Sequence, residues 1–268
     1  MYKDILKKIF YECDSLLKKY NYNFTKFYNV SRVQSGGGLE VTYKKQKVKF
    51  YKISDDGITT IYLSNKDNRN NRCITIILYK DDDKALIHEL TSNPNDSCQL
   101  PDILNKGSSH MDIAMKLIIQ NKEKWGIKTV HITDNSFIYC DGINISLAEL
   151  SFLQYGSTFY GRWGFKPKLK QQIEEYELSQ EKIFKFRVKD INLEKFIKKK
   201  YKKEISKKIN KIIKSYKDNQ EDNFVNWFKD ISRKCLKKEC NFFNKLIRYV
   251  IRRFDLDIFP RYTFIKEL

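Results

Sequence analysis

The first part of the chain alternates between short apolar runs and polar turns. Ahead of them, residues 2–20 place apolar side chains three or four positions apart, which predicts a helix. The later runs are separated by connections rich in Asp, Asn and Gly, so we expect an antiparallel meander of strands. The expected strands are Leu39–Tyr43, Val48–Ile53, Ile58–Leu63, Cys73–Lys80 and Lys84–Thr91.

The spacing of the apolar residues changes after residue 110. Met111–Trp125 has the spacing of an amphipathic helix, and Gly126, a residue type that commonly ends helices, follows it. Thr129–Thr133 is typical of a strand, and Ser146–Tyr155 of a short helix. A meander followed by this unit predicts an α/β (α+β) fold, with a mainly antiparallel sheet and one parallel pair joined through a helix.

The last third of the chain is basic, and its pattern is helical. Apolar residues recur every three to four positions from Leu193 to Tyr216, and lysines fill most of the intervening positions. This predicts a basic amphipathic helix whose apolar stripe packs on the rest of the protein. A second helical stretch is expected over Phe224–Phe254. Most of the net positive charge follows Pro167, so we expect an α/β domain over 1–167 and a Lys-rich helical region over 168–268.

The formal net charge of +19 raises the question of an acidic partner. The basic residues are 42 Lys and only 10 Arg, a bias that an AT-rich genome would produce whatever the function. Arginine is the usual choice for bidentate phosphate and base contacts. We therefore expect a weak, salt-sensitive contact with nucleic acid or an acidic partner through Lys198–Lys217, and the alternative is a solvated helix face.

Neither a membrane span nor a metal site is expected. No run of 18 apolar residues occurs, and the first fifteen residues mix charged with apolar side chains, unlike a secretory signal. The six cysteines include no Cys-x-x-Cys pair, which favours free thiols in an intracellular protein. His88, Cys98 and His110 are too widely spaced for a recognised set of metal ligands.

The segment from Gly156 to Pro167 holds three glycines and four aromatic residues, which are unfavourable inside a helix. It predicts a helix end that turns sharply into an extended segment. Its Tyr-x-x-x-Gly-Phe element, Tyr160 to Phe165, resembles the signature near the end of GNAT-type N-acetyltransferases. Together with His110-Met111 and Thr133-Asp134-Asn135-Ser136, it is similar to a GNAT-like group encoded by large DNA viruses of eukaryotes.

The resemblance implies that acetyl-CoA lies between the strand before the long helix and the strand after it. The pyrophosphate would bind the backbone N–H groups at the start of that helix. Of the family's glycine-rich pattern only the central Gly107 is present, so the alternative is that Ser108 or Ser109 simply caps the helix. The residues implied in cofactor binding are Lys106, Gly107, Ser108, Ser109, His110 and Asn135.

The resemblance also implies the catalytic groups. Tyr160 takes the place of the general acid that protonates the leaving thiolate, and the alternative is a packed core aromatic. Glu89 would assist deprotonation of the acceptor amine, with His88 on the opposite face of the strand. No motif specifies the acceptor. The competing function is a catalytically inactive GNAT-like structural or interaction module, and the implied location is the host cytoplasm or the virion.

Overall fold

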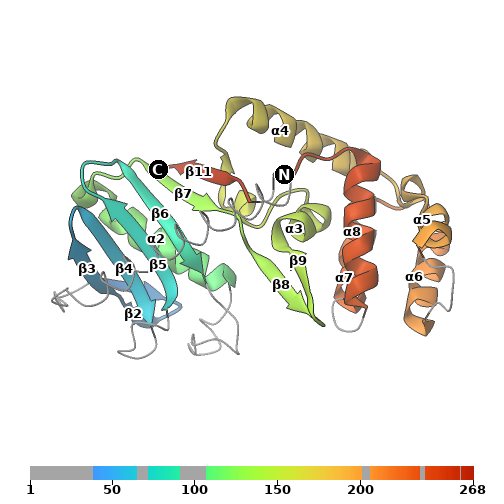
Figure 1. Cartoon of the computed structure of the whole chain (residues 1–268), viewed down its shortest axis with the longest axis horizontal. Helices are drawn as coiled ribbons and strands as arrows, with labels where there is room; N and C mark the ends of the chain where they lie inside the picture. Colours follow the sequence, from blue (N-terminus) through green and yellow to red (C-terminus); the bar gives the residue numbers. More distant parts are fainter. Residues whose placement is uncertain (1–38, 65–71, 91–106, 201–205, 236–238, 260) are drawn as a thin grey trace, which may run out of the picture. The chain divides into compact units, whose positions relative to one another are not determined.

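The computed structural model describes residues 39–64, 72–90, 107–200, 206–235, 239–259 and 261–268. The chain divides into two compact units, Met1–Lys128 and Thr129–Leu268. Helices and mostly antiparallel strands occur in both units (Figure 1). The expected α/β class is confirmed at this level, whereas the specific GNAT arrangement stays a prediction. The helix expected over residues 2–20 lies outside the described residues.

A four-stranded antiparallel sheet forms the centre of the first unit (Figure 1). Its strands follow chain order and confirm three of the expected strands closely. The tight turn between the first two strands uses Asp56 and Gly57, whose φ values of 39° and 77° suit a two-residue hairpin. The strands are β3 (Tyr51–Asp55), β4 (Ile58–Ser64), β5 (Arg72–Tyr79) and β6 (Lys84–Leu90).

The strand expected over Val48–Ile53 is divided between two sheets, which corrects that prediction. Its first part belongs to β2 (Gln46–Lys49), which pairs with β1 (Glu40–Tyr43) in a separate hairpin. The division falls at the buried Phe50, whose N–H donates to Leu39 O at 2.8 Å and so ends the β1–β2 pairing. Strand β3 begins at the next residue, Tyr51.

Helix α2 (Gly107–Trp125) packs along one face of this sheet (Figure 1). Its buried side chains recur at the spacing expected from the sequence, and Gly126 follows the helix with a left-handed φ of 67°. The helix and sheet therefore share one apolar core. The helix contributes Met111, Ile113, Ala114, Leu117 and Ile118, and the sheet contributes Ile61, Ile74, Ile76, Ala85 and Ile87.

In the second unit, the last strand pairs with the first strand. Strand β11 (Thr263–Glu267) pairs antiparallel with β7 (Thr129–Thr133) on one side and with the short β10 (Lys166–Pro167) on the other. Phe264 of β11 is fully buried. The expectation that the last third is helical throughout is therefore wrong at this strand, because its apolar side chain completes the core beside β7.

A second hairpin, β8 (Phe137–Cys140) and β9 (Ile143–Ser146), follows β7. Asp141 and Gly142 form its two-residue turn with φ values of 51° and 75°. The hairpin leads directly into α3 (Leu147–Tyr155), where the Ser146 hydroxyl accepts a hydrogen bond from Glu149 N–H at 3.3 Å. This confirms the short helix expected before the glycine-aromatic segment.

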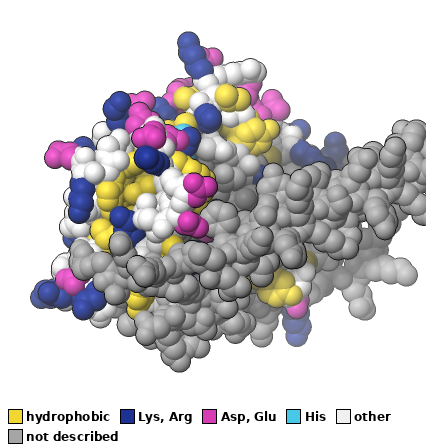
Figure 2. Space-filling view, turned by 60° about the vertical axis from the view of Figure 1, so that its left-hand side comes forward, with side chains coloured by type: hydrophobic (Ala, Val, Ile, Leu, Met, Phe, Trp, Pro, Cys, Tyr) yellow, Lys and Arg dark blue, Asp and Glu magenta, His cyan; other side chains and the backbone are white. Residues whose placement is uncertain are grey.

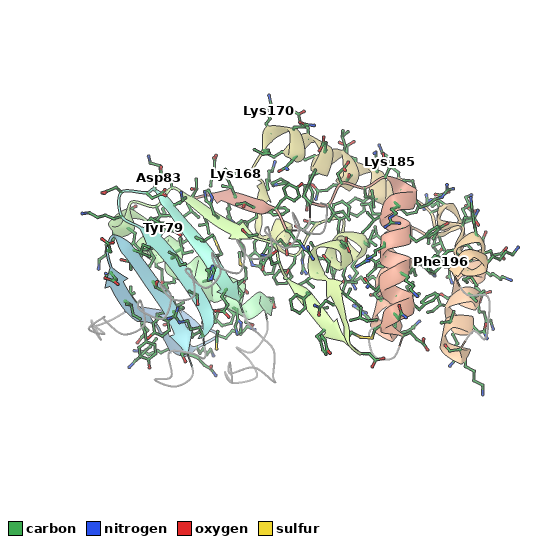
Figure 3. All side chains as sticks on the ribbon, in the orientation of Figure 1. Tyr79, Asp83, Lys168, Lys170, Lys185 and Phe196 are labelled. Carbon is green, nitrogen blue, oxygen red and sulfur yellow. A yellow bond between two sulfur atoms is a disulfide. The ribbon has the colours of Figure 1, made fainter. Side chains whose placement is uncertain are left out.

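The remaining helices surround one large aromatic core. Phe196, labelled in Figure 3, lies with its ring centroid 5.7 Å from that of Phe242 and 4.9 Å from that of Tyr249. The expected basic amphipathic region is confirmed in two helices whose apolar side chains are buried and whose described lysines are exposed. These are α5 (Leu193–Lys200) and α6 (Lys207–Asp218); the others are α4 (Lys170–Lys185), α7 (Phe224–Cys235) and α8 (Cys240–Phe254), with 3-10 turns η1 (Tyr160–Trp163) and η2 (Val188–Ile191).

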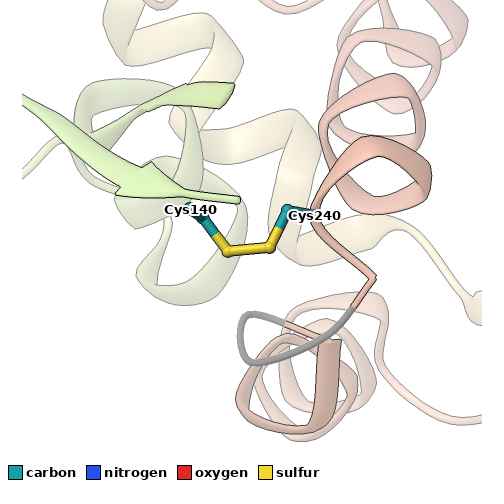
Figure 4. Close-up of a disulfide and its surroundings, with 2 residues drawn as sticks. All are labelled: Cys140 and Cys240. Carbon is teal, nitrogen blue, oxygen red and sulfur yellow. A yellow bond between two sulfur atoms is a disulfide. The ribbon is translucent and has the colours of Figure 1, made fainter. Parts of the chain in front are cut away.

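Cys140 and Cys240 form a disulfide between the end of β8 and the start of α8 (Figure 4). Their Cα atoms are 5.8 Å apart, within the usual range for such bonds. Cys73 is also disulfide-bonded. The expectation of free thiols is therefore wrong for these cysteines. Spacing along the chain could not reveal the pair, because 100 residues separate its members.

Gly156, at the end of α3, offers a test of the local packing. Its φ is 69°, and an added Cβ would collide with the Phe184 ring. Gly142 is a matched control, because it also has a positive φ of 75° but no atom within 4 Å of an added Cβ. We expect Gly142→Ala to lower the free energy of unfolding by about 1 kcal/mol through backbone strain alone.

Gly156→Ala should cost about 1 kcal/mol more than that, because the Phe184 ring must move aside or the backbone must shift. Urea unfolding of both variants measures the difference. Equal losses would show that the ring does not lie against Gly156 in solution.

Candidate active site

Tyr160 is positioned by the turn that follows α3. The chain leaves the helix through Gly156 and forms η1, which begins at Tyr160 and ends at the left-handed Gly164. The Tyr160 ring is 5.2 Å from Phe159 and 6.5 Å from Phe165 between centroids, and the residue is only 6% exposed. The packed-aromatic alternative therefore describes the ring correctly, and the role of the hydroxyl remains a separate question.

The Tyr160 hydroxyl belongs to a buried polar cluster with Asp134 and Ser136. Burial raises the pKa of Tyr160 well above its usual range, and the nearby Asp134 carboxylate raises it further, whereas a hydrogen bond with the Ser136 side chain opposes the shift. Ser136 Oγ in turn donates to Asp134 Oδ1 at 2.5 Å. The raised pKa therefore keeps the phenol neutral.

Asp134 is held firmly although half of its carboxylate is unsatisfied. Its backbone N–H donates to Tyr262 O at 3.1 Å, and its own carbonyl accepts from Arg261 N–H at 2.8 Å. The side chain is buried, and Oδ2 has no hydrogen-bond partner among the residues that the structure describes. Burial raises the Asp134 pKa, although the two hydrogen bonds from Ser136 lower it. A buried carboxyl with a vacant oxygen is costly to keep, and such groups are concentrated at functional sites.

Asp134 and Ser136 were not among the sequence-predicted site residues, although both flank the predicted Asn135. Asn135 itself is exposed, and its N–H donates to Thr133 O at 3.0 Å in a tight turn. The turn places the two neighbours of Asn135 toward the buried Tyr160 and leaves Asn135 in solvent. The available signal was the quoted segment of residues 133–136, in which three polar side chains follow a strand.

Glu89 lies at an irregularity of β6. The register pairs Thr75 with Glu89 but Ile76 with Ile87, so His88 is an extra residue in a β-bulge. The expectation that His88 and Glu89 point to opposite faces rests on regular alternation, which a bulge interrupts, and both residues are exposed. Thr75 Oγ1 donates to Glu89 Oε2 at 3.4 Å. Bulges commonly re-aim side chains beside active sites, so the bulge favours Glu89 as a functional residue.

The start of α2 contains most of the predicted phosphate-binding residues. Gly107 is the first described residue of α2, and Ser108 and Ser109 are already helical, so neither serine is the residue that caps the helix. Ser109 and His110 are buried, and the Tyr43 hydroxyl donates to Ser109 Oγ at 3.4 Å. Any phosphate contact of these two residues would therefore use backbone N–H groups. Lys106 lies outside the described residues.

The predicted site residues are distributed over both units. Glu89 and the start of α2 belong to the first, and Asn135 and Tyr160 belong to the second. The structure brings Tyr160 together with Asp134 and Ser136, and it brings Glu89 together with Thr75. In the described parts of the chain, no three His, Cys, Asp or Glu side chains are grouped to hold a metal ion. None of the described helices has an apolar stretch long enough to cross a bilayer.

A hollow of about 660 Å³ on the first unit has the wrong charge for a phosphorylated cofactor. It lies between the β3–β4 and β5–β6 turns and is lined by five aspartates: Asp55, Asp56, Asp81, Asp82 and Asp83. Tyr79 and Asp83 mark this end of the sheet in Figure 3. Acidic and basic side chains are interspersed on the face that Figure 2 shows. Carboxylates here would repel phosphate groups.

Comparison with known proteins gave no relatives: no family model, curated protein or solved structure matches the chain.

Proposed function

We propose that this protein is an acetyl-CoA-dependent N-acetyltransferase, with Tyr160 as the general acid. The observation that carries the proposal is the buried polar cluster that the Tyr160 hydroxyl forms with Ser136, which is in turn bonded to Asp134. Transfer of the acetyl group to an amine breaks the bond between the acetyl carbon and the CoA sulfur. The leaving thiolate then needs a proton, which a neutral phenol can donate.

The other groups of the proposal come from the first unit. The N–H groups in the first turn of α2, from Gly107 onward, would bind the pyrophosphate, and no acidic side chain stands in that turn. Glu89, exposed at the β6 bulge, would take a proton from the acceptor amine directly or through water. Asn135, at the exposed turn after β7, would help to hold the cofactor.

Thermal unfolding with and without acetyl-CoA tests the proposal directly. A ligand that binds only the native state raises its stability by about 2.7 kcal/mol at a hundredfold excess over the dissociation constant. We therefore expect a clear rise in melting temperature with millimolar acetyl-CoA. Inorganic pyrophosphate is the control, because it carries phosphate charge without the adenosine and pantetheine parts of the cofactor and reports general anion binding to this basic protein.

A smaller rise with pyrophosphate than with acetyl-CoA would support a built cofactor site. Equal rises would reduce the effect to general anion binding, and no rise with acetyl-CoA would exclude the enzyme.

The second candidate is an inactive interaction module, and the exposed lysines of α5 and α6 favour it. The apolar stripe of these helices is buried in the second-unit core, while the described lysines face solvent. Only one of them has a carboxylate nearby, since Lys217 lies 3.8 Å from Glu194. This module would contact nucleic acid or an acidic partner weakly. Undetectable DNA and RNA affinity at roughly 50 mM salt would exclude it.

A further inference from the structure

Two cations share one tyrosine ring on the surface of the second unit. Arg162, in η1, places its guanidinium carbon 4.5 Å from the centroid of the Tyr155 ring. Lys229, in α7, places its ammonium nitrogen 4.8 Å from the same centroid. Tyr155 ends α3 and is 38% exposed. Residues from three separate elements therefore converge on this ring, and two positive charges are brought together in solvent.

No carboxylate in the described part of the chain pairs with these two charges. Among the described residues, neither Arg162 nor Lys229 forms an ion pair with a carboxylate; Asp230, next to Lys229 on α7, is exposed and also forms none. Both cations lie within about 5 Å of one centroid, so they are at most about 10 Å apart, near the screening length at 0.1 M salt. They repel each other, and a bound anion between them would relieve that repulsion.

An exposed aromatic ring lies close to the end of α3. Phe184 of α4 is 53% exposed, and its ring is so close to Gly156 that a Cβ there would collide with it. Gly156 directly follows Tyr155, so the Phe184 ring lies against the same helix end that carries Tyr155. The indole of Trp163 adds a further ring, 5.8 Å from the Arg162 guanidinium. The surface thus combines anion-binding groups with an open aromatic face.

The framework under this surface is held by hydrogen bonds between elements. Gln154 Nε2 donates to Ser232 Oγ at 2.5 Å and ties α3 to α7 close to Lys229. Gln180 Nε2 donates to Gly156 O at 2.8 Å and ties α4 to the end of α3. The elements that carry Tyr155, Phe184 and Lys229 are therefore fixed relative to one another, which lowers the entropic cost of binding a ligand there.

We propose that Tyr155, Arg162, Phe184 and Lys229, the cation–aromatic cluster, bind single-stranded nucleic acid. A backbone phosphate lies between Arg162 and Lys229, and a neighbouring base stacks on the Phe184 ring. Positive grooves combined with exposed aromatic rings are the usual means of binding single strands without sequence preference. A duplex keeps its bases stacked and would leave the ring unused. A phosphopeptide would satisfy the cations but does not supply a base beside every phosphate, as a single strand does. The inference is independent of the proposed acetyltransferase activity.

The test is fluorescence anisotropy of a labelled twelve-residue oligothymidylate with the full chain. Arg162→Gln/Lys229→Gln should weaken binding at least tenfold at about 50 mM salt and reduce the slope of log affinity against log salt by about 0.7, as expected when contact with one phosphate of a single strand is lost. The matched control is Lys168→Gln/Lys170→Gln, which removes the same charge at the start of α4 (Figure 3). This control pair should weaken binding less than twofold.

Phe184→Leu separates stacking from charge. It should weaken oligothymidylate binding about fivefold or more, since loss of base stacking has effects of that size, yet leave inorganic polyphosphate binding unchanged. Circular dichroism and thermal unfolding of each variant check that the fold is retained. Equal losses in the two double variants would reduce the interaction to net charge and overturn the proposal. Tighter binding of duplex DNA, or of a phosphopeptide of equal charge, would overturn it as well.

Discussion

Replacing Tyr160 with phenylalanine should lower turnover by roughly 10²–10⁴-fold while leaving acetyl-CoA affinity nearly unchanged, the effect expected from losing a general acid. The ring packs on Phe159 and Phe165, and these contacts survive the substitution. Only the hydroxyl beside Ser136 and Asp134 is removed. Release of the CoA thiol with a panel of amine acceptors measures turnover, and calorimetry with acetyl-CoA measures affinity.

The pH dependence adds a second readout. The raised pKa keeps the Tyr160 hydroxyl protonated beyond pH 10, where an ordinary phenol ionises. Wild-type turnover should therefore not fall through ionisation of Tyr160 as the pH approaches 10. A loss of turnover that follows an ordinary phenol titration would contradict the assignment.

Two further variants make this prediction specific. Tyr176 is another buried tyrosine of the second unit, and its hydroxyl accepts a hydrogen bond from Thr158 N–H at 2.9 Å. Tyr176→Phe should lower stability by about 1–3 kcal/mol, because it leaves that N–H without a partner, yet retain most of the turnover. Gly107→Val should show the reverse pattern to Tyr160→Phe, with cofactor binding lost because the pyrophosphate cannot approach α2. Normal turnover in Tyr160→Phe, or none in the wild type, would refute the catalytic assignment.

Removing the disulfide should strongly destabilise the second unit. The bond joins residues 100 positions apart, so its loss releases a long loop in the unfolded chain. We expect Cys140→Ala/Cys240→Ala to lower the free energy of unfolding by about 2–5 kcal/mol, with the loss measured by guanidinium denaturation. Cys235→Ala is the control for deleting a buried sulfur, because Cys235 is 1% exposed and lies outside this bond.

The Cys235 control should cost less than half as much as the double substitution. A reductant should destabilise the wild type and have a smaller effect on the double variant, in which only other disulfides such as that of Cys73 remain to be broken. Equal sensitivity of the two proteins would mean that Cys140 and Cys240 are not joined in solution.

The spacing of apolar residues predicted the elements whose formation depends mainly on their own local sequence. Thr129–Thr133 matches β7 throughout, and the helix expected from Met111 is α2, which begins four residues earlier. The β8–β9 hairpin was missed although Asp141-Gly142 is a typical two-residue turn between apolar runs. Helix α4 lies inside the region expected to be helical, but its own bounds were not predicted, for a different reason. Few side chains of α4 are buried, and its apolar residues Leu178 and Phe184 are exposed. The apolar residues of this helix therefore do not mark one face.

The site was predictable only in part, because burial of charge is a tertiary property. The glycine-aromatic pattern singled out Tyr160, which the structure places in a polar cluster. Asp134 follows a strand at a position where an aspartate is normally exposed. No local pattern indicates that its backbone forms hydrogen bonds with Tyr262 and Arg261, far along the chain. The bulge at His88 depends likewise on the partner strand, so alternation within β6 could not reveal it.

Because β11 lies near the end of the sequence, the sheet of the second unit can be completed only late in synthesis. Thr263 pairs with Thr133, so β7 has no sheet partner in its own unit until about 130 further residues have been made. At typical elongation rates that interval is on the order of ten seconds. During it, the growing chain exposes the edge of β7 and the apolar surface that Phe264 later covers. A ribosome stalled before residue 263 would therefore carry a second unit whose helices can form but whose sheet cannot close, and chaperones would recognise that intermediate.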